Sequence, residues 1–364
     1  MQIIGMMSGT SLDGVDMALL ESDGGNDARL LAHGFHPYSD QMRLFLRHVL
    51  DKAAALGDTA ARDRSAWPDW LVEAEAMVTQ QHIAALAGFD RQAARLIGFH
   101  GQTVLHRPET GLTLQIGDAA GLAKAVGLDV IGDFRQADMA AGGQGAPLAP
   151  LFHAALADGL AKPLAVLNLG GIANITCLAD GQPAFAFDTG PANALLDDWV
   201  NSHTGQAYDI DGQLAASGQI DEAALAVLMA HPFFDQKPPK SLDRLAFSLA
   251  PVAALSVADG AATLTAFTAA SVARALDFSP QRPARLLLCG GGRHNPVLRD
   301  RLANFCNMPV EPCEAVGWHG DSLEAQAFAW LALRSLQGLP LSLPSTTGAS
   351  APVSGGRLYR AADN

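Results

Sequence analysis

The stretch that decides the fold is QIIGMMSGTSLDGVDMALL, residues 2–20. Its two apolar runs, Gln2–Met7 and Val15–Leu20, are separated by a turn rich in Ser, Gly, Thr and Asp, and this pattern predicts a β-hairpin. The turn offers backbone N–H groups, hydroxyls and two glycines, which together can cradle a phosphate. The lysine of a Walker loop is absent. A plain tight connection between two strands is the alternative interpretation.

The same opening recurs further along the chain. Apolar runs at Leu164–Leu169, Asn174–Leu178 and Ala184–Phe187 repeat the strand-turn-strand pattern. A chain of 364 residues, 49% hydrophobic, is long enough for two lobes. We therefore expect an α/β protein whose two halves begin alike.

The predicted lobes are residues 1–132 and 133–340, and the tail, about 341–364, is expected to pack on the first lobe. Residues from Leu339 to about Gly356 are rich in Pro, Ser, Thr and Gly, which predicts a crossing segment or tail. Further strands are predicted at 96–99, 112–116, 130–134 and 286–289. Helices are predicted at 41–56, 68–88, 119–126, 147–160, 191–203, 221–230, 257–277 and 321–337.

Composition excludes several classes of protein. Lys and Arg sum to 24 against 37 Asp and Glu, and the net charge of −13 argues against a nucleic-acid or anionic-membrane surface. The four cysteines have no CxxC spacing, so we expect reduced thiols and no zinc site. No apolar run reaches the length of a membrane span. These features indicate a cytoplasmic protein.

Three motifs place polar groups or glycines at the ends of apolar runs. NLGGIANIT (168–176) is a second Gly-Gly turn, and CGGGRHNPVL (289–298) follows a strand with three glycines that would let a flat ligand lie close. FDTGPANALLDDW (187–199) places Asp188 at a predicted strand end, where a carboxylate can act as a general base. Capping of the following helix is the alternative role for Asp188.

Two further motifs gather polar side chains. GFHGQTVLHRP (98–108) holds His100, Gln102 and His106, and DFRQADMAAGGQGAPLAP (133–150) holds Asp133, Arg135 and Gln144. Single histidines are more often structural than catalytic. Arg135 lies among apolar residues, and a buried guanidinium needs a carboxylate or phosphate partner.

These motifs, with TLQIGD (113–118) and EAQAFAWLA (324–332), occur in this order over nearly the whole chain, which resembles the anhydro-N-acetylmuramic acid kinases. That family belongs to the sugar kinase, Hsp70 and actin group of two-lobed ATPases. The resemblance implies an actin-like/hexokinase-like fold with duplicated mixed-sheet domains and a nucleotide in the cleft between the lobes.

The resemblance also implies how ATP is bound. The first hairpin, matched by Gly9, Thr10, Ser11, Leu12, Asp13, Gly14, Val15 and Asp16, would hold the phosphates. Gly170 and Gly171 would form the second phosphate turn, with Gly290, Gly291 and Gly292 on the adenosine side. Many members of the wider group have an aspartate where Met7 stands here, so Mg²⁺ would be held by Asp13 or Asp16, or through water.

The implied reaction cleaves the 1,6-anhydro bridge of 1,6-anhydro-N-acetylmuramic acid, adds water at the anomeric carbon and phosphorylates the 6-oxygen. The products are N-acetylmuramate 6-phosphate and ADP, in cell-wall recycling. Asp188 matches the family's base, with Asp133 as the competitor. Glu324 is expected to support magnesium or water, or to be a solvated helix residue.

The sugar site is expected to draw on His100, Gln102, Asp133, Arg135 and Asn193, with Arg135 and the His100/Gln102 loop as candidates for the lactyl carboxylate. The alternative to Asp133 as the base is a buried ion pair of Asp133 and Arg135 that shapes the sugar pocket. Where many members read Thr-Gly, this chain has Leu242-Asp243, while Lys240, Ser241 and Arg244 remain. The family commonly forms homodimers. A kinase for another anhydro or amino sugar, or a nucleotide sensor without a small substrate, is the alternative.

Overall fold

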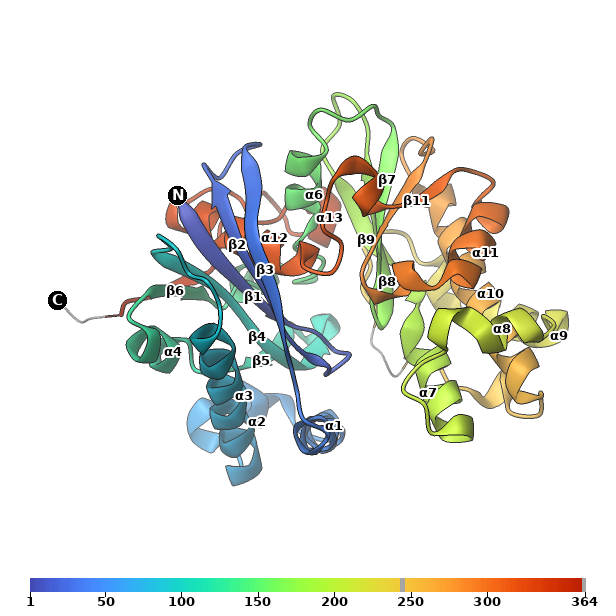
Figure 1. The fold of residues 1–364 in the computed structure, drawn as a ribbon, viewed down its shortest axis with the longest axis horizontal. Helices are drawn as coiled ribbons and strands as arrows, with labels where there is room; N and C mark the ends of the chain where they lie inside the picture. Colours follow the sequence, from blue (N-terminus) through green and yellow to red (C-terminus); the bar gives the residue numbers. More distant parts are fainter. Residues whose placement is uncertain (243–245, 362–364) are drawn as a thin grey trace. The chain divides into compact units, whose positions relative to one another are not determined.

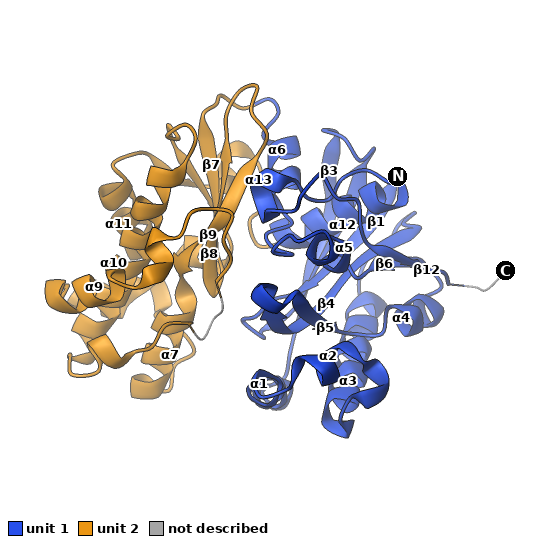
Figure 2. Cartoon of the chain, turned by 180° about the vertical axis from the view of Figure 1, so that it is seen from behind, with its two compact units in different colours: residues 1–159, 322–364 blue, residues 160–321 orange. Residues whose placement is uncertain are grey.

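The computed structural model describes residues 1–242 and 246–361. They form two compact units, Met1–Gly159 with Ser322–Asn364 (unit 1) and Leu160–Asp321 (unit 2), coloured separately in Figure 2. Each unit is built on a mixed sheet covered by helices (Figure 1). Within the described ranges, no helix combines the length and the apolar composition that crossing a membrane requires.

The strands of unit 1 are β1 (Gln2–Ser8), β2 (Gly14–Ser22), β3 (Ala28–Pro37), β4 (Leu96–Arg107), β5 (Leu112–Ile116), β6 (Asp129–Gly132) and β12 (Arg357–Tyr359). Its helices are α1 (Asp40–Ala54), α2 (Asp58–Arg62), α3 (Asp69–Ala87), α4 (Ala119–Val126), α5 (Gln136–Ala140), α6 (Pro150–Leu156), α12 (Leu323–Leu336) and α13 (Pro344–Thr347), with 3₁₀ turns η1 (Arg64–Ala66) and η2 (Pro108–Thr110).

Unit 2 contains strands β7 (Leu164–Leu169), β8 (Ile172–Leu178), β9 (Phe185–Pro191), β10 (Leu286–Cys289) and β11 (Val310–Pro312). Its helices are α7 (Asn193–Thr204), α8 (Gln213–Ser217), α9 (Glu222–Met229), α10 (Val257–Ala275) and α11 (Pro296–Cys306). The 3₁₀ turns are η3 (Ile210–Gly212), η4 (Pro232–Asp235), η6 (Ala250–Val252), η7 (Leu276–Phe278), η8 (Gly291–His294) and η9 (Cys313–Val316).

The two sheets share a five-stranded part with one topology. In the seven-stranded sheet of unit 1 this part has the order β6-β4-β1-β2-β3, with β12 beyond β6 and β5 paired with β4. Within it, β1–β2 and β2–β3 are antiparallel, and β1–β4 and β4–β6 are parallel. Unit 2 has the order β11-β10-β7-β8-β9 with the same directions at each step. The predicted duplication is therefore present in strand order and direction, and it extends beyond the two opening hairpins.

Alternation along β1 assigns its two faces to different helices. Ile4 and Met6 lie in a core cluster that includes residues of α1, α3 and α4. On the opposite face, a Cβ added to Gly5 would lie 1.7 Å from the carbonyl oxygen of Ala325 in α12. Likewise, a Cβ on Gly98 of β4 would lie 2.1 Å from the Phe328 carbonyl oxygen. These glycines let α12 pack directly on the sheet.

The compact units are divided at other positions than the predicted lobes. Residues 133–159 and 322–340, assigned by the sequence to the second lobe, belong to unit 1. The close packing of α12 on β1 and β4 explains this, because a helix 14 residues long is buried against strands that lie more than 200 residues earlier in the chain. The tail also lies in unit 1, where β12 pairs with β6.

Most predicted elements are present, with three notable differences. Strand β3 was missed, and its alternating residues are largely half-buried or exposed, as at a sheet edge. The strand predicted at 96–99 continues to Arg107, so His100 and Gln102 lie in β4 and not in a loop. Similarly, β9 continues to Pro191, so Asp188 lies inside the strand and not at its end.

Candidate functional site

The turn between β1 and β2 is held at both of its ends. The Leu12 amide donates to the Gly9 carbonyl at 3.3 Å, and the Tyr38 amide donates to the Asp13 carbonyl at 2.9 Å. Within the turn, the Ser11 hydroxyl donates to Asp13 Oδ1 at 2.8 Å. Thr10, Ser11 and Asp13 are exposed, whereas the Leu12 side chain is buried in the core of unit 1. The turn is thus a fixed loop whose polar side faces outward.

Gln102 ties β4 to this turn. Its Oε1 accepts a hydrogen bond from the Ser8 hydroxyl at 2.6 Å, and its Nε2 donates to the carbonyls of Gly9 and Thr103, both at 3.2 Å. Ser8 also shares a hydrogen bond of 2.9 Å with the Tyr38 hydroxyl. Gln102 is fully buried. The Gln102 amide is therefore fully occupied by hydrogen bonds within the protein, and it supports the turn between β1 and β2.

Arg135 is oriented by a neutral histidine. Nδ1 of His100 lies 2.9 Å from the Gly101 carbonyl and must carry its proton there, so Nε2 is the acceptor for Arg135 Nε and Nη2 at 3.1 and 2.9 Å. Burial and the Arg135 charge hold the pKa of His100 well below its usual value. Arg135 Nη1 donates to the Gly145 carbonyl at 2.7 Å. The guanidinium is therefore fixed in direction, as recognition of a carboxylate requires.

Glu324 lies in the first turn of α12, in the same electrostatic environment as Arg135 and Asp13. Burial raises its pKa, the Arg135 charge opposes that rise, and the Asp13 charge adds to it. The structure thus places Asp13 of the first turn, Arg135 and Glu324, which are far apart in the sequence, within electrostatic reach of one another. Glu324 is half-buried, so it is not a fully solvated helix residue.

Asp133 has surroundings unlike those predicted. It is exposed and takes a positive φ of 56°, and its Oδ2 accepts a hydrogen bond of 2.5 Å from the Tyr359 hydroxyl in β12. Burial and this carboxylate raise the pKa of Tyr359 to about 12. Strand β6 ends at Gly132, so Asp133 lies just outside the sheet and is exposed. An exposed aspartate does not form the buried ion pair with Arg135 that the sequence suggested.

In unit 2, Asp188 lies next to an irregularity in the sheet. β8 and β9 pair Ala173 with Gly190 but Asn174 with Asp188, so Thr189 is the extra residue of a bulge. The Asp188 side chain is buried, and its Oδ2 accepts a hydrogen bond of 2.8 Å from the Leu242 amide. Its own amide donates to the Lys240 carbonyl at 3.0 Å. The segment 240–242 therefore orients this carboxylate, and Asp188 does not serve as a helix cap.

Lys240 is itself buried beside Asp188. Its Nζ donates to the Phe233 carbonyl at 2.8 Å and lies 4.2 and 5.0 Å from the ring centroids of Phe233 and Phe278. Burial and the Arg274 charge lower the pKa of Lys240 to about 8, against the opposing effect of Asp188 and Asp235. Asp243 and Arg244 lie outside the described residues.

The two predicted glycine turns of unit 2 lie side by side. A Cβ on Gly290 would lie 2.9 Å from the Leu169 carbonyl, and one on Gly292 would lie 2.7 Å from the Leu169 side chain. Asn193 Nδ2 donates to the carbonyls of Leu169 and Gly170, both at 2.9 Å, and amides of Ala192 and Ala194 donate to Gly171. Asn193 supports these turns, and Gly291 is exposed and borders open space.

Arg293 links the Gly290–Gly292 turn to two acidic side chains. This buried guanidinium donates to the Gly290 carbonyl at 3.1 Å, to Asp321 Oδ1 at 2.6 Å and to Glu314 Oε1 at 3.0 Å. Burial lowers the pKa of Arg293, but the bonds to Asp321 and Glu314 outweigh it and raise the value overall. The Gly290 carbonyl is therefore held by an arginine that is itself fixed by two ion pairs.

Comparison with known proteins decides the family. The family model described as anhydro-N-acetylmuramic acid kinase matches residues 1–361. The chain belongs to this family. It is 50% identical to the anhydro-N-acetylmuramic acid kinase of Rhizorhabdus wittichii, with 99% of each chain covered. It is 53% identical to that of Acidiphilium cryptum, with 99% of this chain and 98% of the relative covered.

One chain of the solved PilM–PilN type IV pilus biogenesis complex shares the fold of this family member, with a TM-score of 0.50, 13% identity, and 92% of this chain and 98% of that chain covered. Such a likeness shows the fold alone. The predicted α/β class, with duplicated mixed sheets of the actin-like/hexokinase-like type, is confirmed. The predicted family is confirmed by the match over the whole chain.

Several supporting residues of this kinase-family chain were not predicted from the sequence, among them Ser8, Tyr38, Asp138, Leu242, Arg293 and Tyr359. Leu242 acts through its backbone, which no side-chain pattern reveals. Arg293 could have been found, because an arginine next to a glycine turn and two downstream acidic residues is a pattern that suggests an ion pair.

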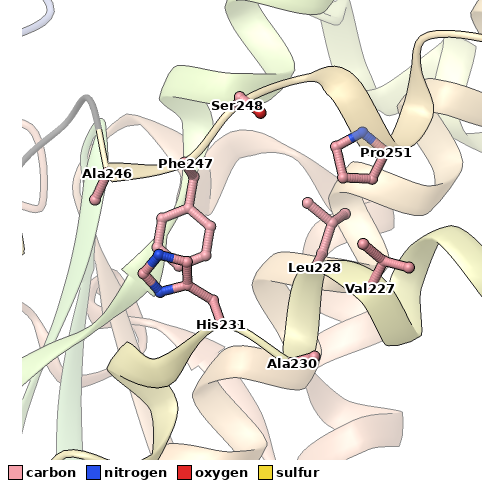
Figure 3. A pocket seen from close by; sticks show the side chains of 8 residues that line it. All are labelled: Val227, Leu228, Ala230, His231, Ala246, Phe247, Ser248 and Pro251. Carbon is pink, nitrogen blue, oxygen red and sulfur yellow. The ribbon is translucent and has the colours of Figure 1, made fainter.

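A cavity of about 220 Å³ lies elsewhere in unit 2, between α9 and the segment around Phe247. Figure 3 shows the His231 and Phe247 rings facing one another at its wall, with centroids 4.3 Å apart. Its other walls include Val227, Leu228 and Pro251. None of the predicted site residues of the kinase family lines this cavity.

Proposed function

We propose that this protein catalyses the ATP-dependent opening and phosphorylation of 1,6-anhydro-N-acetylmuramic acid, giving N-acetylmuramate 6-phosphate and ADP. Membership of the family supports this reaction. The structural observation that supports Asp188 as the base is its carboxylate, which is buried in a strand and accepts a hydrogen bond from the Leu242 amide. Such a fixed carboxylate suits proton abstraction from a single water.

In this proposal Asp188 removes a proton from water while the water oxygen bonds to the anomeric carbon. The bond between that carbon and the bridging 6-oxygen breaks, and the 6-oxygen takes the electron pair. It then bonds to the γ-phosphorus as ADP leaves. Asp188 gains one proton of the water, and the sugar gains the remaining hydroxyl at the anomeric carbon and one phosphoryl group at the 6-oxygen. Release of strain in the bicyclic acetal assists the first step.

The nucleotide is assigned to glycine-rich turns. The segment Gly9–Asp16, exposed at Thr10, Ser11 and Asp13, would hold the phosphates through its backbone amides, with Gly170 and Gly171 as the second phosphate turn and Gly290–Gly292 beside the adenosine. The adjacency of the two turns in unit 2 supports a common ligand for them. Backbone donors of this kind suit a protein of net charge −13, because they bind phosphate without a cationic surface.

Magnesium would accompany the nucleotide. Mg²⁺ is usually held by one or two carboxylates together with phosphates and water, and the described residues contain no cluster of three metal-ligating side chains. Asp13, exposed on the phosphate turn, fits the role of a single carboxylate partner. Bound Mg²⁺ neutralises charge on the phosphates. Glu324, whose burial raises its pKa, suits a place beside the water or sugar better than a metal site.

The sugar is assigned to the polar residues around Arg135. We propose that Arg135 binds the lactyl carboxylate, because its guanidinium is fixed by His100 and the Gly145 carbonyl. His100, being neutral, does not compete for the anion. Asp133 is the alternative candidate for the base, and its substitution is compared with that of Asp188. A site of this kind should reject a sugar that lacks the carboxylate.

The decisive experiment measures ADP release with and without the anhydro sugar and identifies the product by mass spectrometry and NMR. We expect ADP formation only with the sugar and Mg²⁺, and a 6-phosphate without the bridge. Equal ATP turnover without sugar would instead favour a nucleotide sensor. Faster turnover of levoglucosan or another amino sugar would change the assigned substrate.

We further propose that the reaction takes place in the cytoplasm during peptidoglycan recycling. All four cysteines are free and buried, which suits a reducing compartment. A homodimer is proposed on the family resemblance alone. Size-exclusion chromatography with light scattering tests the dimer, and fractionation of the source cells tests the compartment.

A further inference from the structure

Asp138 is a buried carboxylate that the proposed reaction does not use. It lies in α5 and is 2% exposed. Its Oδ2 accepts a hydrogen bond of 2.7 Å from the Gly145 amide. Its Oδ1 accepts one of 2.6 Å from the Thr347 hydroxyl and another from Ser342. A buried charge is costly unless such donors satisfy it, and all three donors are neutral.

These bonds join two distant segments around one carboxylate. Ser342 and Thr347 come from the C-terminal segment and are themselves buried, at 1% and 0% exposure. The Gln144 amide adds a bond of 2.7 Å to the Thr347 carbonyl. The glycine at 143 is required here, because a Cβ would lie 2.2 Å from Asp138 Oδ2. The loop 142–145 is therefore clamped between α5 and the C-terminal segment.

The clamped loop ends at the carbonyl that holds Arg135. Gly145 donates its amide to Asp138 and, through its carbonyl, accepts Arg135 Nη1 at 2.7 Å. One residue thus links the buried carboxylate to the guanidinium. Displacing the Gly145 amide would turn the peptide chain at this residue and move the carbonyl that fixes Arg135.

We propose that Asp138 is a positioning residue for substrate specificity, and that Ser342 and Thr347 of the C-terminal segment act with it. Through Gly145 they set the direction of Arg135 and thereby the preference for a sugar that carries a carboxylate. This inference rests on the proposed role of Arg135 in binding that carboxylate. It assigns the C-terminal segment a part in recognition, although that segment offers no contact with the sugar in this scheme.

The test compares two ligands that differ in one charge: the anhydro sugar with its lactyl carboxylate, and the analogue with a neutral carboxamide in its place. Calorimetry gives the Kd of each, and their ratio reports carboxylate recognition. We expect Arg135→Met and Asp138→Ala each to lower this preference about tenfold. In the Arg135→Met background, Asp138→Ala should lower it no further, because both act through one guanidinium.

A matched pair of substitutions tests the C-terminal segment. Thr347→Val removes a donor to Asp138 while keeping the shape of the side chain, and we expect about a threefold loss of preference. Thr346→Val in the same helix removes a hydroxyl whose hydrogen bonds, among the described residues, are to Leu343, and it should leave the ratio unchanged. Asp138→Asn can still accept from Gly145 and should largely restore the ratio. If Asp138→Ala does not fold, the valine pair carries the test.

Three outcomes would overturn the inference. Asp138→Ala could weaken the binding of both ligands equally, or it could lower the preference further in the Arg135→Met background. The two valine substitutions could also change the ratio equally. If Arg135→Met lowers the ratio and Asp138→Ala does not, Asp138 has no such role while the proposed function stands. If Arg135→Met leaves the ratio unchanged, the carboxylate assignment and this inference are both wrong.

Discussion

The backbone amide of Leu242 donates a hydrogen bond of 2.8 Å to Oδ2 of Asp188, across 54 residues of sequence. A backbone donor orients the carboxylate without bringing a competing charge to it. The same segment accepts the Asp188 amide through the Lys240 carbonyl. The side chain and the main chain of Asp188 are therefore positioned by one loop.

Replacing Asp188 with Asn should lower kcat by about 10²- to 10⁴-fold, because the amide cannot take the proton from water. The affinity for ATP should change little, since the glycine turns are untouched. Turnover and nucleotide binding are measured separately, and Asp133→Asn is the matched control. If Asp133→Asn has the larger effect on kcat, the assignment of the base is reversed.

Leu242→Pro removes the amide that orients Asp188, and we expect kcat to fall about tenfold or more with a smaller change in the KM for the sugar. Leu242→Ala keeps the amide and is the control, with near-normal kcat expected. Equal losses in the two variants would mean that the leucine side chain matters and the hydrogen bond does not.

Gln102→Met tests whether this residue supports the nucleotide turn or contacts the sugar. Because its amide bonds to Ser8 and Gly9, we expect the KM for ATP to rise about fivefold and the free energy of unfolding to fall by about 1–3 kcal/mol. Gln115→Met in β5 is the matched control. A rise confined to the KM for the sugar would instead place Gln102 in direct contact with substrate.

Arg293→Lys should weaken nucleotide binding by about tenfold, because a lysine ammonium lacks the planar guanidinium fork whose separate nitrogens bond to Gly290, Asp321 and Glu314. The Kd for the sugar should stay the same. Arg301→Lys on α11 serves as the control, and fluorescence or calorimetric titration with ATP measures the difference. Unchanged ATP affinity would separate the Gly290–Gly292 turn from the nucleotide.

Buried histidines predict loss of stability in mild acid. His82 is fully buried, its Nδ1 bonds to the Val78 carbonyl at 2.8 Å, and burial lowers its pKa to about 4. Since the folded state then binds fewer protons than the unfolded state, stability falls as pH drops from about 6.5 to about 4. The slope for one such histidine is about 1.4 kcal/mol per pH unit.

His82→Leu should therefore reduce the pH slope of the unfolding free energy by about that amount over this window. Urea unfolding at several pH values measures the slope, and His48→Leu at an exposed site is the control. His100, His106 and His153, whose pKa values are also lowered by burial, continue to contribute to the acid sensitivity of this variant. An unchanged slope in His82→Leu would mean that His82 does not contribute.

The sequence by itself determined the local elements and the family. The hairpin Gln2–Leu20, its repeat from Leu164 and the glycine turns depend on apolar alternation and turn residues, which act over a few positions. The order of motifs along the whole chain then identified the family. These features could be read from the chain because each is encoded by neighbouring residues.

Only the tertiary structure decided which polar side chains form hydrogen bonds within the protein. Gln102 and Asn193 were predicted to bind sugar, yet their amides bond to turn carbonyls, and α12 joins unit 1 through contacts with Gly5 and Gly98. Ser342 and Thr347, two of the three donors to Asp138, lie more than 200 positions away in the sequence. Hydrogen bonds and close backbone approach depend on long-range packing, which local sequence patterns do not encode.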